Sequence, residues 1–402
     1  MFFLKAAFCR AFQLGFRAAQ PFLPYRDPEI IGSCAELGNV CKGEGIHSVL
    51  IVTDQGIVKN GLVAPIEAAL KKSGVAYAIY DRTQPNPTAQ NVEEAKVLYQ
   101  RHNCQCLIAI GGGSSIDCAK ALGALIAYPG RTLKQLGGAL KVHRRLPTLI
   151  AIPTTAGTGS EATLAAIITD TEKQYKYALM SFPLIPRYAV LDAALTYSLP
   201  PQLTATTGVD ALTHAVEAYI GRATTKETRR LALEATKLVF ENVEKAYSDG
   251  RNHAARQNML HAANKAGVAF SKSYIGYIHA VAHSLGGRYG IPHGLANAVT
   301  MPYVLEAYGA SIHEKLRDLA IAAGVATAQD SPAAAAEKFI AAVKALNARM
   351  GIPTKLKGIR SADIPAMAKC AEREANPLYP VPVLMTQREL EVFYHQLAET
   401  EQ

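Results

Sequence analysis

The chain has 402 residues, of which 49% are hydrophobic and 19% are charged, and its formal net charge is +9. This length is typical of two domains, and the composition excludes a disordered or fibrous protein. The lysines and arginines are scattered and are not interleaved with stacking aromatic residues, which argues against a nucleic-acid partner.

Residues 1–24 form a basic, amphipathic segment. Its phenylalanines share the segment with Lys5, Arg10 and Arg17, and it contains no acidic residue. Charges interrupt its short apolar runs, so it fits neither a cleaved secretion signal nor a membrane span. Two interpretations stay open: an extra helix that packs on the body of the protein, or a helix that contacts a membrane surface or a partner.

From Ser48 onward, short β-type runs alternate with helical stretches. This alternation predicts βαβ units and therefore a parallel, doubly wound sheet. The expected strands cover residues 48–54, 75–81, 106–113, 146–155, 167–170, 177–181 and 188–192, and the first two helices cover residues 63–72 and 92–101.

The third of these strands ends in a glycine-rich turn, Gly111 to Ser115, directly before a helical pattern. Three glycines allow a tight turn whose N–H groups lie at a helix N-terminus, where the helix dipole favours a phosphate. The turn lacks the G-x-G-x-x-G spacing, so a plain strand-to-helix turn is the alternative.

Two further features follow strand ends. The loop Thr154 to Glu161 is rich in glycine and hydroxyl residues that can approach a cofactor closely, although it can equally be a turn in which Glu161 caps a helix. Asp54 closes the first strong strand, where an acid can accept hydrogen bonds from a ribose diol. Because an acid there repels a 2′-phosphate, Asp54 favours NAD over NADP.

Beyond residue 197 the pattern becomes helical nearly throughout, as in residues 226–247. We therefore expect three parts: the basic segment 1–24, an α/β dinucleotide-binding domain at residues 25–197 and an all-helical domain at residues 198–402. A ligand cleft between the two domains is the default position for the site.

The helical half carries a candidate metal site. Asp210 and His214 stand four residues apart and so project from one helix face, and His279 and His283 repeat that spacing. His293 follows in the turn IPHG. A lone histidine is usually structural, but one carboxylate with several imidazoles suits a divalent transition metal such as Fe²⁺ or Zn²⁺.

These residues resemble the iron-containing (group III) alcohol dehydrogenases. The resemblance runs from Asp54 to Pro302 through GGGSSIDCAK, AIPTTAGTGSE, TGVDALTHAVEAY and HAVAHSLGGRYGIPHGLANAV. It implies the dehydroquinate synthase-like architecture, with an N-terminal α/β dinucleotide-binding domain and an all-helical C-terminal domain. Two parts depart from the family pattern: the residues before Pro24, and the stretch NPLYPVPV from Asn376.

Carried over position by position, the resemblance implies roles for individual residues. His283 becomes a candidate proton relay beside the nicotinamide and is not a ligand. The implied metal ligands are Asp210, His214, His279 and His293. The implied cofactor contacts are Asp54, Gly112, Gly113, Ser114, Thr154, Thr155, Thr158 and Lys176.

The expected activity is hydride transfer between a small alcohol, or the corresponding aldehyde, and NAD(H). Fe²⁺ is the favoured metal and Zn²⁺ the alternative, and the resemblance implies a homodimer. Seven cysteines without a C-x-x-C pair indicate a reducing compartment, so a cytoplasmic location is expected. Cys104 and Cys106, two residues apart at a strand start, are expected to point the same way into the core.

Other functions compatible with the same residues remain open. A hydroxyacid–oxoacid transhydrogenase would keep its nicotinamide bound and need no free NAD. A metal-dependent hydrolase or lyase could use the same ligands without a nucleotide. A dehydroquinate synthase-like cyclase would need more Lys, Arg and Asn around its substrate, and a purely structural metal site gains nothing from a dinucleotide loop.

Overall fold

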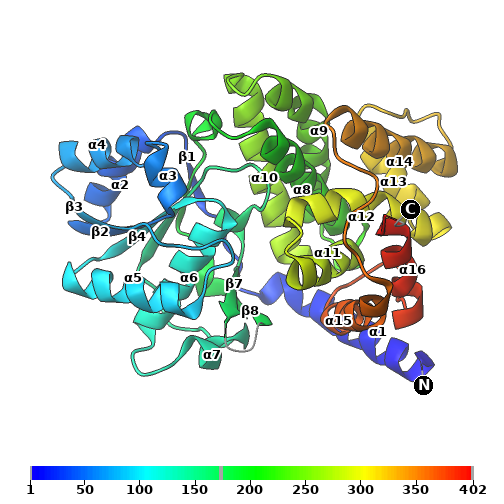
Figure 1. Ribbon diagram of the computed structural model, residues 1–402, viewed down its shortest axis with the longest axis horizontal. Helices are drawn as coiled ribbons and strands as arrows, with labels where there is room; N and C mark the ends of the chain where they lie inside the picture. Colours follow the sequence, from blue (N-terminus) through cyan, green and yellow to red (C-terminus); the bar gives the residue numbers. More distant parts are fainter. Residues whose placement is uncertain (1, 172–174, 400–402) are drawn as a thin grey trace. The chain divides into compact units, whose positions relative to one another are not determined.

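The computed structural model describes residues 2–171 and 175–399. The contacts between residues divide the chain into two compact units (Figure 1). An α/β unit comprises Pro24–Leu199, and a helical unit comprises Met1–Leu23 together with Pro200–Gln402. The N-terminal segment therefore belongs to the helical unit, although the whole α/β unit separates it in sequence from the rest of that unit.

A six-stranded parallel sheet forms the centre of the α/β unit, in the order β1-β9-β6-β4-β2-β3. A second sheet has the order β5-β8-β7, with β7 and β8 antiparallel. The strands are β1 Glu29–Ile31, β2 Ser48–Val52, β3 Ala76–Tyr80, β4 Cys106–Gly111, β5 Gly138–Ala139, β6 Thr148–Pro153, β7 Ala165–Asp170, β8 Tyr175–Met180 and β9 Tyr188–Val190.

Helices cover both faces of the larger sheet, as successive side chains along β2 illustrate. Leu50 and Val52 pack into a buried cluster with α5 and α6, whereas Val49 and Ile51 pack on the other face with α2 and α4 (Figure 1). Because both faces are buried, the strand sequence is continuously apolar. The α-helices are α2 Leu37–Gly43, α3 Gln55–Lys59, α4 Ala64–Lys72, α5 Ala89–Arg101, α6 Gly113–Ala127 and α7 Leu133–Leu136, and the 3₁₀ turns are η2 Cys34–Glu36, η3 Ser160–Ala162, η4 Phe182–Leu184 and η5 Ala193–Thr196.

The helical unit places its helices around a buried apolar core. Gly208 allows α8 to approach α9 closely, because a Cβ there would lie 2.5 Å from Val243 Cγ2. Its elements are α1 Phe2–Ala19, η1 Gln20–Phe22, α8 Pro201–Ile220, α9 Lys226–Ser248, α10 His253–Ser273, α11 Tyr277–Tyr289, α12 His293–Tyr308, η6 Gly309–Ile312, α13 His313–Ala322, α14 Pro332–Arg349, η7 Ser361–Asp363, α15 Ile364–Ala375 and α16 Gln387–Leu397.

The predicted fold class, an α/β dinucleotide-type unit followed by a helical unit, is confirmed. The prediction for Cys104 and Cys106 was half wrong. Both are buried, but Cys104 packs in the cluster with α5 and α6 while Cys106 packs on the opposite face of the sheet. Cys104 precedes β4, so the two-residue alternation of a strand does not apply to it.

In the part of the chain that the structure describes, none of the helices combines the length and the apolar character needed to cross a membrane. Helix α1 packs on the helical unit, as the first of the two interpretations predicts. Lys5 on α1 pairs with Glu372 on α15 at 2.7 Å, and Phe16 meets the ring of Tyr274 edge-to-face at 4.9 Å between centroids.

Candidate active site

Three helices bring four predicted ligands together in the helical unit. Asp210 and His214 lie one turn apart on α8, His279 lies on α11, and His293 is the first residue of α12. One ligand atom from each of the four lies within 4.8 Å of those of the others. The first three residues are buried and His293 is partly exposed, so the cluster is closed on one side and accessible on the other.

The donor set fits a divalent metal ion. Oδ1 of Asp210 lies 3.5 Å from Nε2 of His293 and 3.9 Å from Nε2 of His279. Among the described residues, the buried Nε2 of His279 has no hydrogen-bond partner, which is costly unless another group satisfies it. The ring of His214 stacks on that of His279 with centroids 4.4 Å apart. One carboxylate and three imidazoles in this arrangement suit iron or zinc.

A glycine permits the close approach of α12 to α8. A Cβ at Gly294, next to His293, would lie 2.5 Å from the backbone oxygen of Thr206 and 3.5 Å from Cβ of Asp210. A larger residue would therefore push the start of α12, and with it His293, away from Asp210. The glycine of the IPHG turn is thus part of the geometry that assembles the ligands.

Glu217, which the sequence analysis missed, binds the ring nitrogen of His279 that is not the proposed ligand atom. Its carboxylate accepts hydrogen bonds from Nδ1 of His279 at 2.6 Å and from the backbone N–H groups of Gly276 and Ile278 at 2.8 Å each. The Nδ1 bond fixes the proton on that nitrogen and leaves Nε2 as the ligand atom. Glu217 lies seven residues after Asp210, on the same face of α8.

Burial controls the protonation of this pair. It raises the pKa of Glu217 to about 8, against the effect of the backbone N–H groups of Gly276, Ile278 and His279, which lower this pKa. The same burial lowers the pKa of His279 well below its usual range, and the neighbouring imidazoles lower it further. Because a metal binds the neutral ring, His279 is kept in the form that a ligand requires.

Replacing Glu217 by glutamine is expected to weaken metal binding about 10–100-fold, the usual effect of removing a carboxylate behind a histidine ligand. A competition titration against a fluorescent chelator measures the change. The matched control is Glu241→Gln on α9, whose carboxylate pairs at the surface with Lys237 at 3.9 Å. Equal metal affinity in the Glu217→Gln variant and the wild type would show that Glu217 does not support the ligand.

His283 lies beside the ligands, as a partly exposed side chain. Its ring stacks on that of His293 with centroids 5.1 Å apart and an interplanar angle of 20°. Its Nδ1 donates a 2.6 Å hydrogen bond to Oε1 of Glu374 on α15, a second residue that the sequence analysis missed. Burial acts to raise the pKa of Glu374, but His283 and the hydroxyl of Tyr379 outweigh it, so this pKa is lowered.

The predicted nucleotide residues gather in the α/β unit, around the turn between β4 and α6. Gly111 has φ +144°, and a Cβ there would lie 2.6 Å from Oγ of Ser115 and 3.6 Å from Oδ2 of Asp54. A Cβ at Gly113 would lie 3.2 Å from Cγ2 of Thr158. The glycines therefore allow the turn, the end of β2 and the loop after β6 to meet.

The remaining predicted contacts adjoin the same turn. The backbone N–H of Thr154 donates to Gly111 at 3.0 Å, and Gly112 lies next to Thr155. Asp54 caps α3 by accepting from the N–H of Ile57 at 3.0 Å. Lys176 reaches the turn indirectly: its Nζ donates to Asn86 at 2.7 Å, and the N–H of Asn86 donates to Oγ of Ser114 at 3.4 Å.

Two charged residues of α6, missed in the sequence analysis, hold the second loop in place. Lys120 is fully buried and its Nζ donates to the carbonyls of Thr163 and Ala165 at 2.8 Å each. Asp117 accepts from Oγ of Ser160 at 2.7 Å. Because a buried ammonium must be saturated with acceptors, these bonds tie the loop firmly to the helix that follows the glycine turn.

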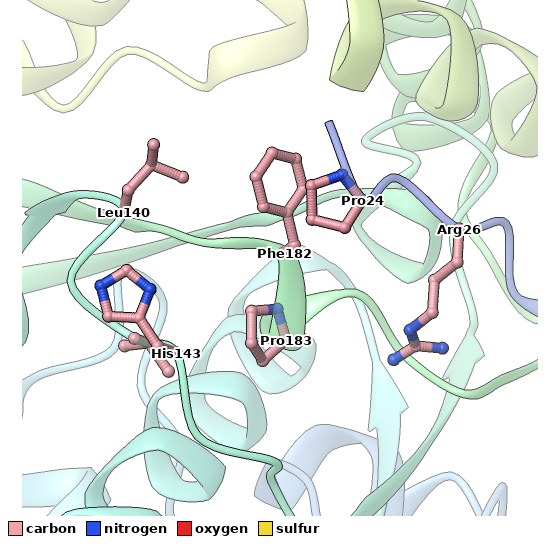
Figure 2. A pocket seen from close by; sticks show the side chains of 7 residues that line it. Pro24, Arg26, Leu140, His143, Phe182 and Pro183 are labelled. Atoms are coloured by element: carbon pink, nitrogen blue, oxygen red, sulfur yellow. The ribbon is translucent and has the colours of Figure 1, made fainter. Parts of the chain in front are cut away.

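A separate pocket of about 300 Å³ lies elsewhere in the α/β unit (Figure 2). Its lining includes Arg26, Leu140, His143 and Phe182, and none of the predicted site residues. The Arg26 guanidinium donates to the carbonyls of Ile185 and Pro186, so it serves to hold the local backbone. The pocket is therefore no part of the candidate active site.

Comparison with known proteins connects both groups of residues to one family. The family described as iron-containing alcohol dehydrogenase matches residues 30–193, and its C-terminal family matches residues 204–398. A 1,3-propanediol dehydrogenase of Klebsiella pneumoniae is 39% identical over 344 residues, which cover 85% of this chain and 89% of the relative. An NAD-dependent methanol dehydrogenase of Bacillus methanolicus is 36% identical over 342 residues, 85% of this chain and 90% of the relative.

A solved structure agrees in fold as well as in sequence. The alcohol dehydrogenase of Oenococcus oeni superimposes with a TM-score of 0.88 and 35% identity, covering 93% of this chain and 100% of that one. The family matches cover both units, and the candidate metal residues lie in the C-terminal match. The chain belongs to the iron-containing alcohol dehydrogenase family, whose members are metal-dependent oxidoreductases of alcohols and aldehydes.

Proposed function

We propose that this enzyme transfers hydride between short-chain alcohols and NAD⁺, and reduces the corresponding aldehydes in the reverse direction. The observation that carries the proposal is the cluster of one carboxylate and three imidazoles whose ligand atoms lie within 4.8 Å of one another. In this proposal the metal ligands are Asp210, His214, His279 and His293. The nucleotide contacts are Asp54, Gly112, Gly113, Ser114, Thr154, Thr155, Thr158 and Lys176.

The residues of the chain prepare the chemistry. When bound, the metal supplies positive charge near the substrate oxygen, and the nicotinamide supplies the hydride acceptor. Glu217 orients His279 so that its Nε2 faces the metal position. The N–H groups at the start of α6 favour the pyrophosphate of the dinucleotide, because they lie at the positive end of the helix dipole.

His283 is proposed to carry the proton that leaves the alcohol. Its Nδ1 is engaged by Glu374, so the neutral ring has its lone pair on Nε2. The side chain is 37% exposed, which allows exchange of that proton with solvent. A positioned imidazole of this kind contributes about 10²–10⁴-fold to rate.

NAD is proposed as the preferred cofactor because Asp54 lies next to the glycine turn. The Asp54→Ser variant keeps a capping oxygen for the N–H of Ile57 and removes the charge. We expect the ratio of kcat/KM with NADP⁺ to that with NAD⁺ to rise about tenfold, equal to about 1.4 kcal/mol. Steady-state kinetics with both cofactors measure the ratio, and an unchanged ratio would show that Asp54 does not select against the 2′-phosphate.

The proposed function is tested with a panel of substrates and the iron-loaded protein. The panel contains 1,3-propanediol, methanol and a series of other primary alcohols, with NAD⁺ reduction followed by the absorbance of NADH. We expect alcohol-dependent NADH formation with at least one member. No NADH formation across the panel, with hydrolysis of ester or amide substrates instead, would favour the metallohydrolase.

We propose further that the enzyme forms a homodimer in the cytoplasm and uses the outer face of residues 1–24 as a contact surface. The homodimer is inferred from the resemblance to the family, and six buried thiols fit a reducing compartment.

The contact surface is supported by Leu4, Phe8 and Phe22, which are 79%, 61% and 88% exposed. With Arg17 exposed and no acid before Asp27, an anionic membrane surface suits this face. Sedimentation with anionic vesicles tests the membrane contact, and sedimentation equilibrium tests the dimer.

A further inference from the structure

The side of α1 that faces the helical unit carries polar side chains beside the apolar Cys9 and Phe16. Gln13 is buried and Arg10 is half-buried, whereas Leu4, Phe8 and Phe12 on the other side are exposed. An amphipathic helix of a globular protein normally buries its apolar side. The polar side chains on this covered side therefore need hydrogen-bond partners there.

Those hydrogen-bond contacts are with the proline-rich segment Pro377–Pro382. Three of its six residues are prolines, which lack an N–H and interrupt regular structure, so its carbonyls need donors from elsewhere. Arg10 and Gln13 supply four such hydrogen bonds. From Arg10 they reach the carbonyls of Val381 at 2.7 Å and Pro382 at 2.9 Å, and from Gln13 those of Tyr379 at 2.8 Å and Pro377 at 3.2 Å.

The same segment is also connected to His283, the candidate proton relay, through Tyr379. The hydroxyl of Tyr379 donates to Oε1 of Glu374 at 2.7 Å, and this oxygen accepts the Nδ1–H of His283 at 2.6 Å. Tyr379 is buried and its backbone N–H donates to Ala375 at 2.7 Å, so its hydroxyl has little freedom. A continuous series of hydrogen bonds therefore runs from α1 to His283.

We infer that α1 is a positioning element of the active site: Arg10 and Gln13 fix the segment 377–382, and through Tyr379 and Glu374 they orient the ring of His283. The inference rests on the proposed function, in which His283 passes the proton. Helix α1 and the proline-rich segment thereby act together on one side chain of the active site.

A positioning role and a merely structural role differ in what they change. A structural staple alters stability, while a positioning residue alters turnover with bound metal and nucleotide affinity retained. The variants are Arg10→Ala/Gln13→Ala, Tyr379→Phe and His283→Ala, and the first two are also combined with His283→Ala. The control is Lys5→Ala, which removes a surface ion pair of the same helix. The readouts are kcat, KM for NAD⁺, iron content and the midpoint of thermal unfolding, with the best alcohol of the panel as substrate.

We expect His283→Ala to lower kcat by about 10²-fold, within the usual contribution of a positioned acid–base group. Arg10→Ala/Gln13→Ala and Tyr379→Phe are each expected to lower kcat about tenfold, with iron content and KM for NAD⁺ unchanged. In the His283→Ala background they should cause no further loss, because groups that act through one residue are coupled. Lys5→Ala should keep the wild-type kcat.

Two failures are distinguishable. If His283→Ala keeps wild-type turnover, the proposed role of His283 is wrong, and the inference falls with it. If His283→Ala is impaired but Tyr379→Phe and Arg10→Ala/Gln13→Ala keep wild-type kcat, the inference alone is overturned. The inference is also overturned if these variants lower kcat equally with and without His283. The Tyr379→Phe variant removes a single hydroxyl, so it decides the matter even if the double variant does not fold.

Discussion

Replacing His279 by alanine is expected to remove the metal and the activity together while the fold survives. The ring provides one of four ligand atoms that lie within 4.8 Å of one another, and its buried Nε2 has no hydrogen-bond partner in the described residues. Loss of the metal removes several kcal/mol of charge stabilisation, so kcat should fall about a thousandfold or more. Metal analysis and NADH absorbance on the same sample measure both effects.

The stability of this variant should fall only modestly. Glu217 loses the donor at 2.6 Å but keeps two backbone N–H groups, so the free energy of unfolding is expected to drop by about 1–3 kcal/mol. The control is His395→Ala, an exposed histidine on α16 that should keep metal and turnover. Wild-type turnover in metal-free His279→Ala protein would contradict the assigned site.

Replacing Gly111 by alanine is expected to weaken cofactor binding. At φ +144° an added Cβ lies 2.6 Å from Oγ and 2.9 Å from Cβ of Ser115, so the turn must change shape. The new shape misplaces the N–H groups proposed to bind the pyrophosphate. Losing one charge-assisted hydrogen bond costs about 1.5–3 kcal/mol, so the dissociation constant of NADH should rise about 10–100-fold. A titration of NADH fluorescence measures it.

Gly130→Ala is the matched control for backbone strain. Gly130 also has positive φ, +92°, but nothing lies within 4 Å of its Cβ position, and it follows the far end of α6. Both variants should lose about 1–3 kcal/mol of stability from the unfavourable backbone, but only Gly111→Ala should lose NADH affinity. Equal NADH affinity in Gly111→Ala and Gly130→Ala would exclude the glycine turn as the nucleotide site.

The sequence predicted the elements whose pattern is local and strong. Strands β2, β4 and β6 are buried on both faces and read as continuous apolar runs, so their positions follow from the sequence. Strand β1, Glu29–Ile31, was missed because it has three residues and lies at the edge of the sheet with two of them exposed. The two-residue strand β5 gives no pattern at all.

The residues of the candidate site likewise divide into those with a local signal in the sequence and those without one. Asp210 and His214 could be paired because one helical turn separates them, and the resemblance connected them with His279 and His293. Glu217 had a usable signal, since it lies seven residues after Asp210 and so on the same face of α8. Lys120 also had a usable signal, because it is a charged residue within an otherwise mostly apolar helix.

Other contacts had no local signal. Glu374 lies 91 residues from His283, and Arg10 lies 371 residues from Val381. Such pairs depend on how the helices of the unit pack, which no periodicity in a single sequence encodes. Helix α1 shows the difficulty: the sequence reveals an amphipathic helix, but only the packed structure reveals that Arg10 and Gln13 lie on its covered side.

The most direct test of the proposed enzyme is a titration of metal-stripped protein with Fe²⁺ under anaerobic conditions, with alcohol and NAD⁺ in excess. Turnover should be absent at the start, rise in proportion to the iron added and level off at one ion per chain. Full turnover before any iron is added, or none after a full equivalent of iron is bound, would contradict the assignment of Asp210, His214, His279 and His293 as the ligands of a catalytic metal.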